Sequence, residues 1–401
     1  MGDSMKVGVQ FNWQNYTDWG RFLSKGSEQP ARSDQDIYDE EMHLAGLVEP
    51  LGFDSYWAID HHFTPYVMTG GALQHLTYFA GKTSRIDFGT MIVVLPWYDP
   101  LVIADQVSVL DNLLQGRQLT LGVGRGAAVR EFDAFRVPMS EARGRFNESL
   151  EVLRRALSNE WFSFDGEHYQ IPETTIRPHF RNPQRILDRM RIAWSSPETL
   201  PIAANAGLGM LMTNQKSWDE YGKDVAAFNS VRAERGWAPT QPTVVVRTSC
   251  FETEEEAWDL MSRHSLESSE SSRLHYQFDD VERFKNTKGY EQYAQLGSAK
   301  PSDAAIVERG ARPQAWGTPD QVFEKLKHIQ ESTGAEEFVL NFKFGTLSAE
   351  KAEQSMRLFA SEVLPRLHAL DAPLDISMQG ATSGADRADF ETEKAPTSLG
   401  F

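Results

Sequence analysis

Short apolar segments alternate with longer amphipathic segments along most of the chain. The short segments are rich in Val, Ile, Phe and Met, and near-continuous apolar runs of this length are typical of strands that are buried on both faces. We therefore predict strands at residues 6–11, 55–59, 86–95, 118–123, 191–194, 209–213, 243–251 and 337–342.

Between these strands, apolar residues recur at the three- and four-residue spacing of an amphipathic helix. The spacing predicts helices at residues 34–51, 71–81, 100–114, 140–161, 195–206, 218–235, 254–264, 319–333 and 349–370. Two segments show no clear period. Residues 167–185 contain three prolines, and residues 265–315 are rich in Ser, Glu and aromatic side chains.

Strands that alternate with helices specify parallel strands joined by crossover helices. Eight such units favour a closed barrel over an open sheet, so the predicted fold is α/β, a TIM (β/α)8 barrel with insertions. We expect residues 5–370 to form one domain. The tail at 371–401 has almost no large apolar residues and is expected to be disordered.

Composition narrows the functional classes. The net charge of −17, without a Lys/Arg block, argues against a nucleic-acid surface. The single cysteine, Cys250, excludes a disulfide within the chain and suits a cytoplasmic setting. No apolar run is long enough for a membrane span, and the N-terminus lacks the apolar stretch of a signal peptide.

Ionisable side chains follow the predicted strand at 55–59. Asp60, His61 and His62 lie where an α/β barrel keeps its chemistry, at the carboxyl end of a strand. Consecutive side chains point to opposite sides, so only one histidine can face the barrel mouth. That histidine could be a general acid/base or a structural residue satisfied by the neighbouring carboxylate. No HxH or HxxxH motif accompanies the pair, so we predict no metal site.

Glycines surround Arg125 in the segment 122–126, which resembles a dinucleotide fingerprint but has the wrong spacing. We interpret Gly124 and its neighbours as a floor that lets a flat ring approach the backbone, with Arg125 as a phosphate ligand. A plain turn with a surface arginine is equally compatible. Cys250, at a strand end, is expected to be a small buried residue.

Hydroxyl groups and a helix start follow the strand at 191–194. Ser195, Ser196 and Thr199 could bind a phosphate together with Arg125, although an ordinary helix cap has the same pattern. Trp97 and Tyr98 end another strand and could line a substrate pocket or only pack at the rim.

Six segments resemble the bacterial luciferase-like flavin monooxygenases, in the family's order and at similar spacing over residues 5 to about 370. They are residues 52–64 (GFDSYWAIDHHFT), 90–96 (TMIVVLP), 110–117 (LDNLLQGR), 121–126 (LGVGRG), 317–319 (GTP) and 355–365 (SMRLFASEVLP). The resemblance implies a TIM barrel that receives reduced FMN from a separate flavin reductase and activates O2 as a C4a-peroxyflavin. It also implies that residues 265–315 form a lid and that the chain is a homodimer.

The resemblance also assigns roles to single residues. The family's catalytic histidine falls on His61, its preceding acidic residue on Asp60, and the acidic residue after the arginine motif on Glu131. Its phosphate ligands fall on Arg125, Ser196 and Thr199. Two positions depart from the pattern: Ser195 replaces a glutamate in the phosphate site, and Gly124 replaces the luciferase cysteine near the flavin, so light emission is not expected.

The expected function is therefore an FMNH2- and O2-dependent monooxygenase that acts on a small, largely apolar organic substrate, with aldehydes and ketones as candidates. One alternative is an oxidoreductase on the same barrel that uses the deazaflavin F420 and transfers hydride. Another is a non-catalytic partner subunit, which the presence of His61, Arg125, Ser196 and Thr199 argues against.

Overall fold

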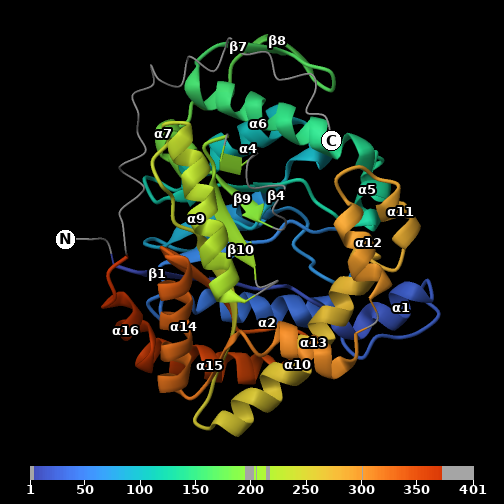
Figure 1. Cartoon of the computed structure of the whole chain (residues 1–401), viewed down its shortest axis with the longest axis vertical. Coiled ribbons are helices and arrows are strands. Elements are labelled where there is room, and N and C mark those ends of the chain that lie inside the picture. Colours follow the sequence, from blue (N-terminus) through green and yellow to red (C-terminus); the bar gives the residue numbers. More distant parts are fainter. Residues whose placement is uncertain (1–3, 195–202, 205, 214–216, 300, 373–401) are drawn as a thin grey trace.

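A parallel sheet forms the centre of the computed structural model, which describes residues 4–194, 203–204, 206–213, 217–299 and 301–372 (Figure 1). Its strands are β1 (Lys6–Gln10), β2 (Ser55–Ala58), β3 (Asp87–Thr90), β4 (Val93–Val94), β5 (Leu119–Thr120), β6 (Gly122–Gly124), β9 (Arg191–Trp194), β10 (Gly209–Thr213), β11 (Thr243–Cys250) and β13 (Glu337–Asn341).

The sheet closes on itself. β1 pairs in parallel with both β2 and β13, and the order continues through β11, β10, β9 and β6 on one side and through β3 and β5 on the other. The ring is completed because β3 pairs with β5 and β4 with β6. When β3 with β4 and β5 with β6 are each counted as one position, the ring has eight parallel strand positions in chain order. The predicted barrel is therefore confirmed.

Two predicted strands are each divided in the structure. The apolar run at 86–95 forms β3 and β4 with a break between them, and the run at 118–123 forms β5 and β6. The Thr90 hydroxyl donates to the carbonyl oxygen of Gly122 at this break, at 2.8 Å. A side-chain hydrogen bond therefore joins these two neighbouring segments where the backbone hydrogen bonds between strands are interrupted.

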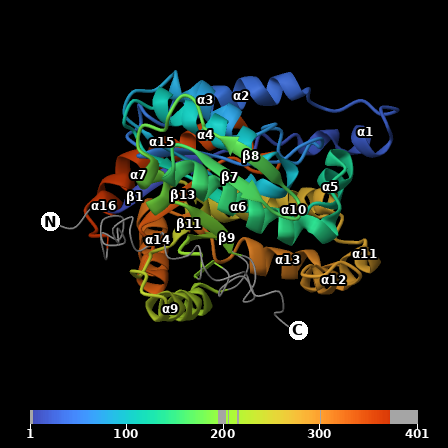
Figure 2. The same cartoon turned by 90° about the horizontal axis from the view of Figure 1, so that it is seen from above.

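Helices surround the barrel, and α2 and α3 lie on the opposite side of the molecule from α9 (Figure 2). The helices are α1 (Trp19–Leu23), α2 (Asp34–Gly46), α3 (Ala72–Ala80), α4 (Pro100–Leu113), α5 (Val129–Phe135), α6 (Ala142–Ser158), α7 (Pro183–Asp188), α9 (Trp218–Glu234), α10 (Glu254–Tyr276), α11 (Val281–Lys285), α12 (Glu291–Ser298), α13 (Asp303–Gly310), α14 (Pro319–Thr333), α15 (Ala349–Glu362) and α16 (Leu364–His368). The predicted bounds of α14, β9 and β10 are confirmed.

Trp57 on β2 packs inside the barrel. It forms a buried cluster with Leu211 on β10 and Val339 on β13, strands that are not all neighbours, so these side chains meet across the interior. A Cβ atom on Gly89 would lie 2.3 Å from the Trp57 ring. Glycine is therefore needed there because the indole packs directly on the strand backbone.

The prediction that residues 167–185 are irregular is wrong in part. Residues 162–174 form an antiparallel hairpin of β7 (Phe162–Asp165) and β8 (Gln170–Thr174), and α7 follows. Pro172 obscures β8 in the sequence, but a two-stranded ribbon has edges where a missing N–H donor is tolerated.

The prediction that residues 265–315 are irregular is also wrong. α10 continues to Tyr276, and α11, α12, α13 and the short strand β12 (Ala315–Gly317) follow. The buried positions of α10 have helical spacing, but many of them are serine and histidine: Met261, His264, Ser265, Ser268, Ser271 and His275. A search for apolar periodicity misses a helix whose buried face is polar.

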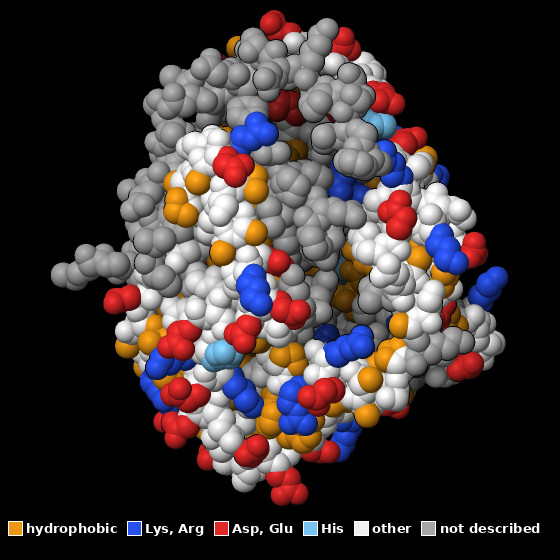
Figure 3. Space-filling model, viewed as in Figure 1, with side chains coloured by type: hydrophobic (Ala, Val, Ile, Leu, Met, Phe, Trp, Pro, Cys, Tyr) orange, Lys and Arg blue, Asp and Glu red, His pale blue; other side chains and the backbone are white. Residues whose placement is uncertain are grey.

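Charged side chains of both signs are mixed over the face shown in Figure 3, among the residues drawn in colour. No helix of the described part of the chain is long and apolar enough to cross a membrane. Most of the expected disordered tail lies outside the described residues.

Because Trp57 packs directly on Gly89, adding a side chain at position 89 should destabilise the protein. Gly89→Ala should destabilise the fold by about 1–3 kcal/mol, because the added methyl group overpacks the barrel interior. Gly81→Ala is the matched control, since Gly81 has a right-handed helical backbone and the nearest atom to its added Cβ would be 3.5 Å away. Urea midpoints measure both changes, and equal midpoints for the two variants would contradict the packing argument.

Candidate active site

The loop after β2 is fixed by Asp60, which is 2% exposed. Its carboxylate accepts hydrogen bonds from the Val94 backbone N–H at 2.9 Å and from the Tyr98 hydroxyl at 2.8 Å. His62 Nε2 lies 2.9 Å from the same carboxylate and 2.7 Å from the Tyr98 oxygen. Asp60 and His62, both buried, and the half-buried Tyr98 thus connect this loop to the segment after β4.

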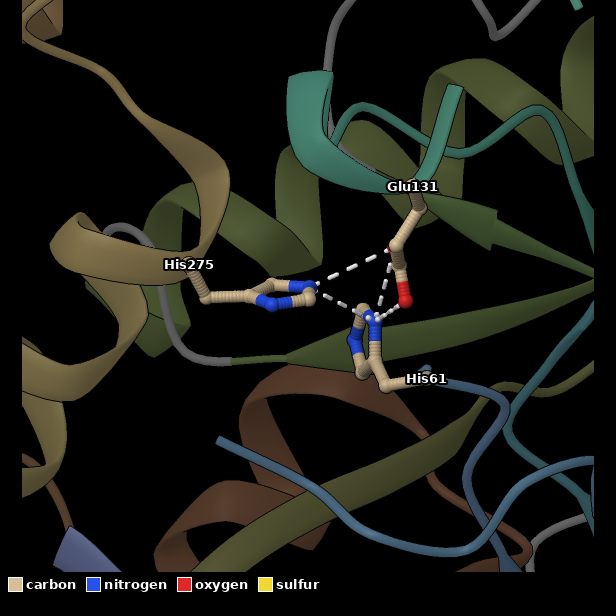
Figure 4. Close-up of side chains that lie close together, drawn as sticks. All are labelled: His61, Glu131 and His275. Carbon is tan, nitrogen blue, oxygen red and sulfur yellow. Dashed lines mark hydrogen bonds and ion pairs between the residues drawn. The ribbon is translucent and has the colours of Figure 1, made fainter. Parts of the chain in front are cut away.

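Glu131 organises the other side of the loop. It lies in the first turn of α5, it is fully buried, and its carboxylate accepts the His62 backbone N–H at 2.6 Å. His61 Nδ1 lies 3.1 Å from Glu131 Oε1, and His275 Nε2 lies 3.3 Å from Oε2. Figure 4 shows the two imidazoles converging on this carboxylate from the loop and from the end of α10.

We call His61, Glu131 and His275 the triad. The protonation of Glu131 and His275 follows from their burial and from their hydrogen-bond partners. Burial disfavours ionised Glu131, but the charge of His61 and hydrogen bonds from His275 and His61 outweigh it and lower the pKa of Glu131 to about 2. Burial lowers the pKa of His275 to about 4. At neutral pH the site therefore holds an ionised glutamate and a neutral His275.

An ionised carboxylate only accepts hydrogen bonds, which assigns the protons around it. His61 carries a proton on Nδ1 and His275 carries one on Nε2, each directed at Glu131. The Thr64 hydroxyl lies 2.7 Å from His275 Nδ1, and the Tyr276 hydroxyl lies 3.1 Å from His61 Nε2. Burial raises the pKa of Tyr276, so its phenol is protonated and donates to His61.

The same three side chains have a composition that can bind a metal ion. One ligand atom from each of His61, Glu131 and His275 lies within 4.8 Å of the others. Both histidine nitrogens also lie within hydrogen-bonding distance of the Glu131 carboxylate, so the three side chains can satisfy one another through protons. Hydrogen bonding therefore explains the geometry without an ion.

Arg125 follows β6 at the barrel mouth. Its Nη2 donates to the Gly289 carbonyl oxygen at 2.6 Å, and its guanidinium carbon lies 4.0 Å from the centre of the Tyr290 ring. Its Nη1 is buried and has no hydrogen-bond partner among the described residues. A buried donor of this kind fits an anionic group such as a phosphate.

Gly124, the expected floor for a flat ring, lies beside Ile92 in this structure. A Cβ on Gly124 would lie 1.9 Å from Ile92 Cδ1, and one on Gly126 would lie 2.6 Å from Val94 Cγ1. Protein side chains occupy the space beside both glycines. Their lack of a side chain therefore allows tight packing within the barrel wall in this structure.

Trp97 and Tyr98 both contact other side chains of the protein. The Trp97 ring stacks on Phe135 with a centroid distance of 5.4 Å, and the Tyr98 hydroxyl is committed to Asp60 and His62. Ser195, Ser196 and Thr199 lie outside the described residues. Cys250 is buried, and burial raises the pKa of its thiol to about 12, which fits the expected small core residue.

His275 and Tyr276 were not identified from the sequence, although both contact His61. They lie 214 and 215 residues away along the chain. The sequence contains one pattern that could have identified them. Ser265, Ser268 and His275 recur at helical spacing after Met261. This recurrence predicts one face of a helix, and its polar residues indicate that the face covers a site.

The neutral state of His275 predicts a pH dependence of stability. An unfolded histidine binds a proton below about pH 6.5, whereas folded His275 remains neutral until about pH 4. The unfolded state then binds more protons, so stability should fall by at most about 3 kcal/mol for this residue as pH decreases through that window. His275→Asn should make the decrease shallower in urea titrations at pH 7, 6, 5 and 4.5.

Buried His75, whose pKa is also lowered to about 4, provides the comparison for that experiment. It is present in both proteins, so part of the decrease should remain in His275→Asn. An unchanged pH dependence in the variant would show that His275 is not held neutral.

Comparison with known proteins gives the family. Residues 19–337 match the model described as luciferase-like monooxygenase. The alkanal monooxygenase alpha chain of Photobacterium leiognathi is 25% identical over 348 residues, which cover 84% of this chain and 96% of that protein. The F420-dependent glucose-6-phosphate dehydrogenase of Kineococcus radiotolerans is 29% identical over 285 residues, covering 67% and 82%.

A solved structure has the same fold. The oxygenating constituent of 3,6-diketocamphane monooxygenase from Pseudomonas putida, in complex with FMN, matches with a TM-score of 0.65 and 19% identity, covering 90% of this chain and 98% of that chain. The barrel, the histidine-bearing loop after β2 and the length of the family match agree with one another. The chain belongs to the luciferase-like monooxygenase family.

Proposed function

We propose that the protein is an FMNH2- and O2-dependent monooxygenase that acts on a small, largely apolar organic substrate, with aldehydes and ketones as candidates. The observation that carries the proposal is His61, which Glu131 orients from a buried position at the barrel mouth. The FMN complex of the structural relative and the alkanal monooxygenase relative support this choice of chemistry.

The cofactor proposal rests on Arg125. Its buried, unpartnered Nη1 suits the FMN phosphate, with Ser196 and Thr199 as the further ligands that the family resemblance suggests. Bound reduced FMN would supply the electrons for the reaction with O2, while the protein supplies position and exclusion of water. We propose that a separate flavin reductase delivers the FMNH2 and that the enzyme acts as a homodimer.

His61 is proposed to hold and transfer the proton that the reaction needs. Glu131 keeps a proton on Nδ1 and leaves Nε2, which lies beside the Tyr276 hydroxyl, to accept or donate the proton of the reaction. Tyr66 and His275 pack against the imidazole with ring centroids 5.1 and 4.7 Å away, which limits the access of water. Asp60 supports this arrangement indirectly, because its carboxylate fixes the loop on which His61 lies.

An F420-dependent oxidoreductase is the alternative within the same family, and the dehydrogenase relative favours it. The two proposals differ in cofactor and in reaction with O2. Purified protein mixed separately with reduced FMN and reduced F420 should bind FMN more tightly. With an aldehyde or ketone substrate added, exposure to air should then oxidise the bound FMN and place one oxygen atom of O2 in the product. Preferential binding of F420 and hydride transfer without oxygen incorporation would overturn the proposal.

Arg125→Ala should weaken FMN binding about 10- to 150-fold, because a charge-assisted hydrogen bond worth roughly 1.5–3 kcal/mol is lost. Arg263→Ala is the matched control, since it removes a charge from the exposed surface of α10. Equilibrium dialysis with FMN measures both dissociation constants. Equal affinities for the two variants would exclude Arg125 as a phosphate ligand.

His61→Ala should reduce formation of oxygenated product by at least about 100-fold, the usual contribution of a positioned acid/base, while FMN affinity stays nearly unchanged. His43→Ala, a change at an exposed histidine of α2, is the control. Mass spectrometry of reactions with a panel of aldehydes and ketones measures the product. A large loss of FMN affinity in His61→Ala would instead identify this histidine as a cofactor ligand.

A further inference from the structure

A second arginine, Arg247, lies on β11. Val245, on the same strand, packs with the interior cluster around Trp57. Side chains two residues apart on a strand share a face, so Arg247 also faces the barrel interior, nearer to the carboxyl end of the strand. It therefore lies above the apolar filling of the barrel, on the side where the chemistry of a TIM barrel is found.

The neighbouring interior positions are polar. Arg247 is the register partner of Asn341 on β13, whose amide donates to Asn12 Oδ1 at 2.9 Å. Gln10 on β1 donates to the same oxygen at 3.4 Å, and its own Oε1 is buried without a partner among the described residues. β1, β13 and β11 thus present a wall of amides and one cation above the apolar floor.

The charge of Arg247 is not neutralised by a carboxylate. Among the described residues, the contacts of its guanidinium are a hydrogen bond from Nη2 to Ser268 Oγ at 3.2 Å and the Phe344 ring, whose centre lies 5.7 Å from the guanidinium carbon. Burial lowers the pKa of Arg247, so the surroundings disfavour its charge. Arg247 is half-buried, and a half-buried cation with no carboxylate beside it can pair with the negative charge of a ligand.

The acidic groups of the surrounding elements are already engaged. Glu131 accepts hydrogen bonds in the triad, and Glu267 on α10 accepts them from Thr346 and pairs with His264. Glu41 on α2 pairs with Lys343 at 3.2 Å. A counter-ion for Arg247 from these groups would require one of the existing networks to be broken.

Tyr66 connects Arg247 to the triad. Its ring centroid lies 5.1 Å from that of His61 and 4.7 Å from that of His275. Burial raises the pKa of Tyr66, and the positive charge of Arg247 acts on the same hydroxyl in the opposite direction. Tyr66 therefore packs against both histidines of the triad and lies within electrostatic range of Arg247.

We propose that Arg247 binds a carboxylate of the substrate and so places its apolar body against His61. The inference rests on the proposed monooxygenase function and adds a substrate class: small organic acids with an apolar chain or ring. Arg125 directly follows β6, which β9 and β10 separate from β11 in the sheet. The proposed phosphate site and the proposed carboxylate site are thus on different walls of the barrel.

The test uses the FMN-loaded protein with paired probes of equal size. Straight-chain carboxylates from acetate to decanoate, together with benzoate, are titrated by calorimetry against the corresponding neutral amides. At least one carboxylate should bind ten or more times more tightly than its amide. Arg247→Met should abolish this preference, Arg247→Lys should retain part of it, and Arg263→Met on exposed α10 should leave it unchanged.

Several outcomes would overturn the inference. They are binding of no carboxylate, equal binding of acids and amides by the native protein, and an unchanged preference in folded Arg247→Met. Weaker FMN binding in Arg247→Met with the acid preference intact would assign the arginine to the cofactor instead. Failure of the native protein to bind FMN would refute the proposed function separately, because the acid preference can also be measured without FMN.

Discussion

The active-site structure depends on one buried carboxylate. Glu131 is removed from water, and an ionised carboxylate in such a place is stable only when donors surround it. Those donors come from His61 and the His62 backbone on the β2 loop and from His275 at the end of α10. Satisfying this charge therefore brings together three elements that are far apart in the sequence, and it orients His61 as a consequence.

α10 has a second role beyond covering the barrel. Its buried face carries serine and histidine where an ordinary packing helix would carry leucine, and it contributes His275 and Tyr276 to the His61 site and Ser268 to Arg247. Polar groups on a buried face cost free energy unless they find partners. Ser268 and His275 find their partners at the barrel mouth, and Ser271 accepts a hydrogen bond from Trp19.

Much of the fold could be predicted from the sequence because the barrel follows a simple rule. Apolar runs such as β9 and β10 alternate with amphipathic helices such as α14, and parallel pairing follows from that alternation. His61, Glu131 and Arg125 were identified through family motifs. The structure brings His61 and Glu131 together, while the roles of all three remain proposals.

The rest of the site depends on tertiary contacts that have no local signal. The polar face of α10 concealed the helix and with it His275. Arg247 appeared only as a member of an apolar strand, and its isolation from carboxylates is visible only in three dimensions. The contact of Ile92 with Gly124 was also not foreseen, because Ile92 lies in the break between β3 and β4, which the continuous apolar run did not indicate.

A crystal structure of the protein with bound FMN would test the central claim most directly. We expect the phosphate to lie on Arg125 and the isoalloxazine ring to lie in the barrel mouth beside His61, with the hydrogen bonds of Glu131 to His61 and His275 retained. A flavin bound outside the barrel mouth, or a His61 imidazole turned away from both Glu131 and the flavin, would contradict it.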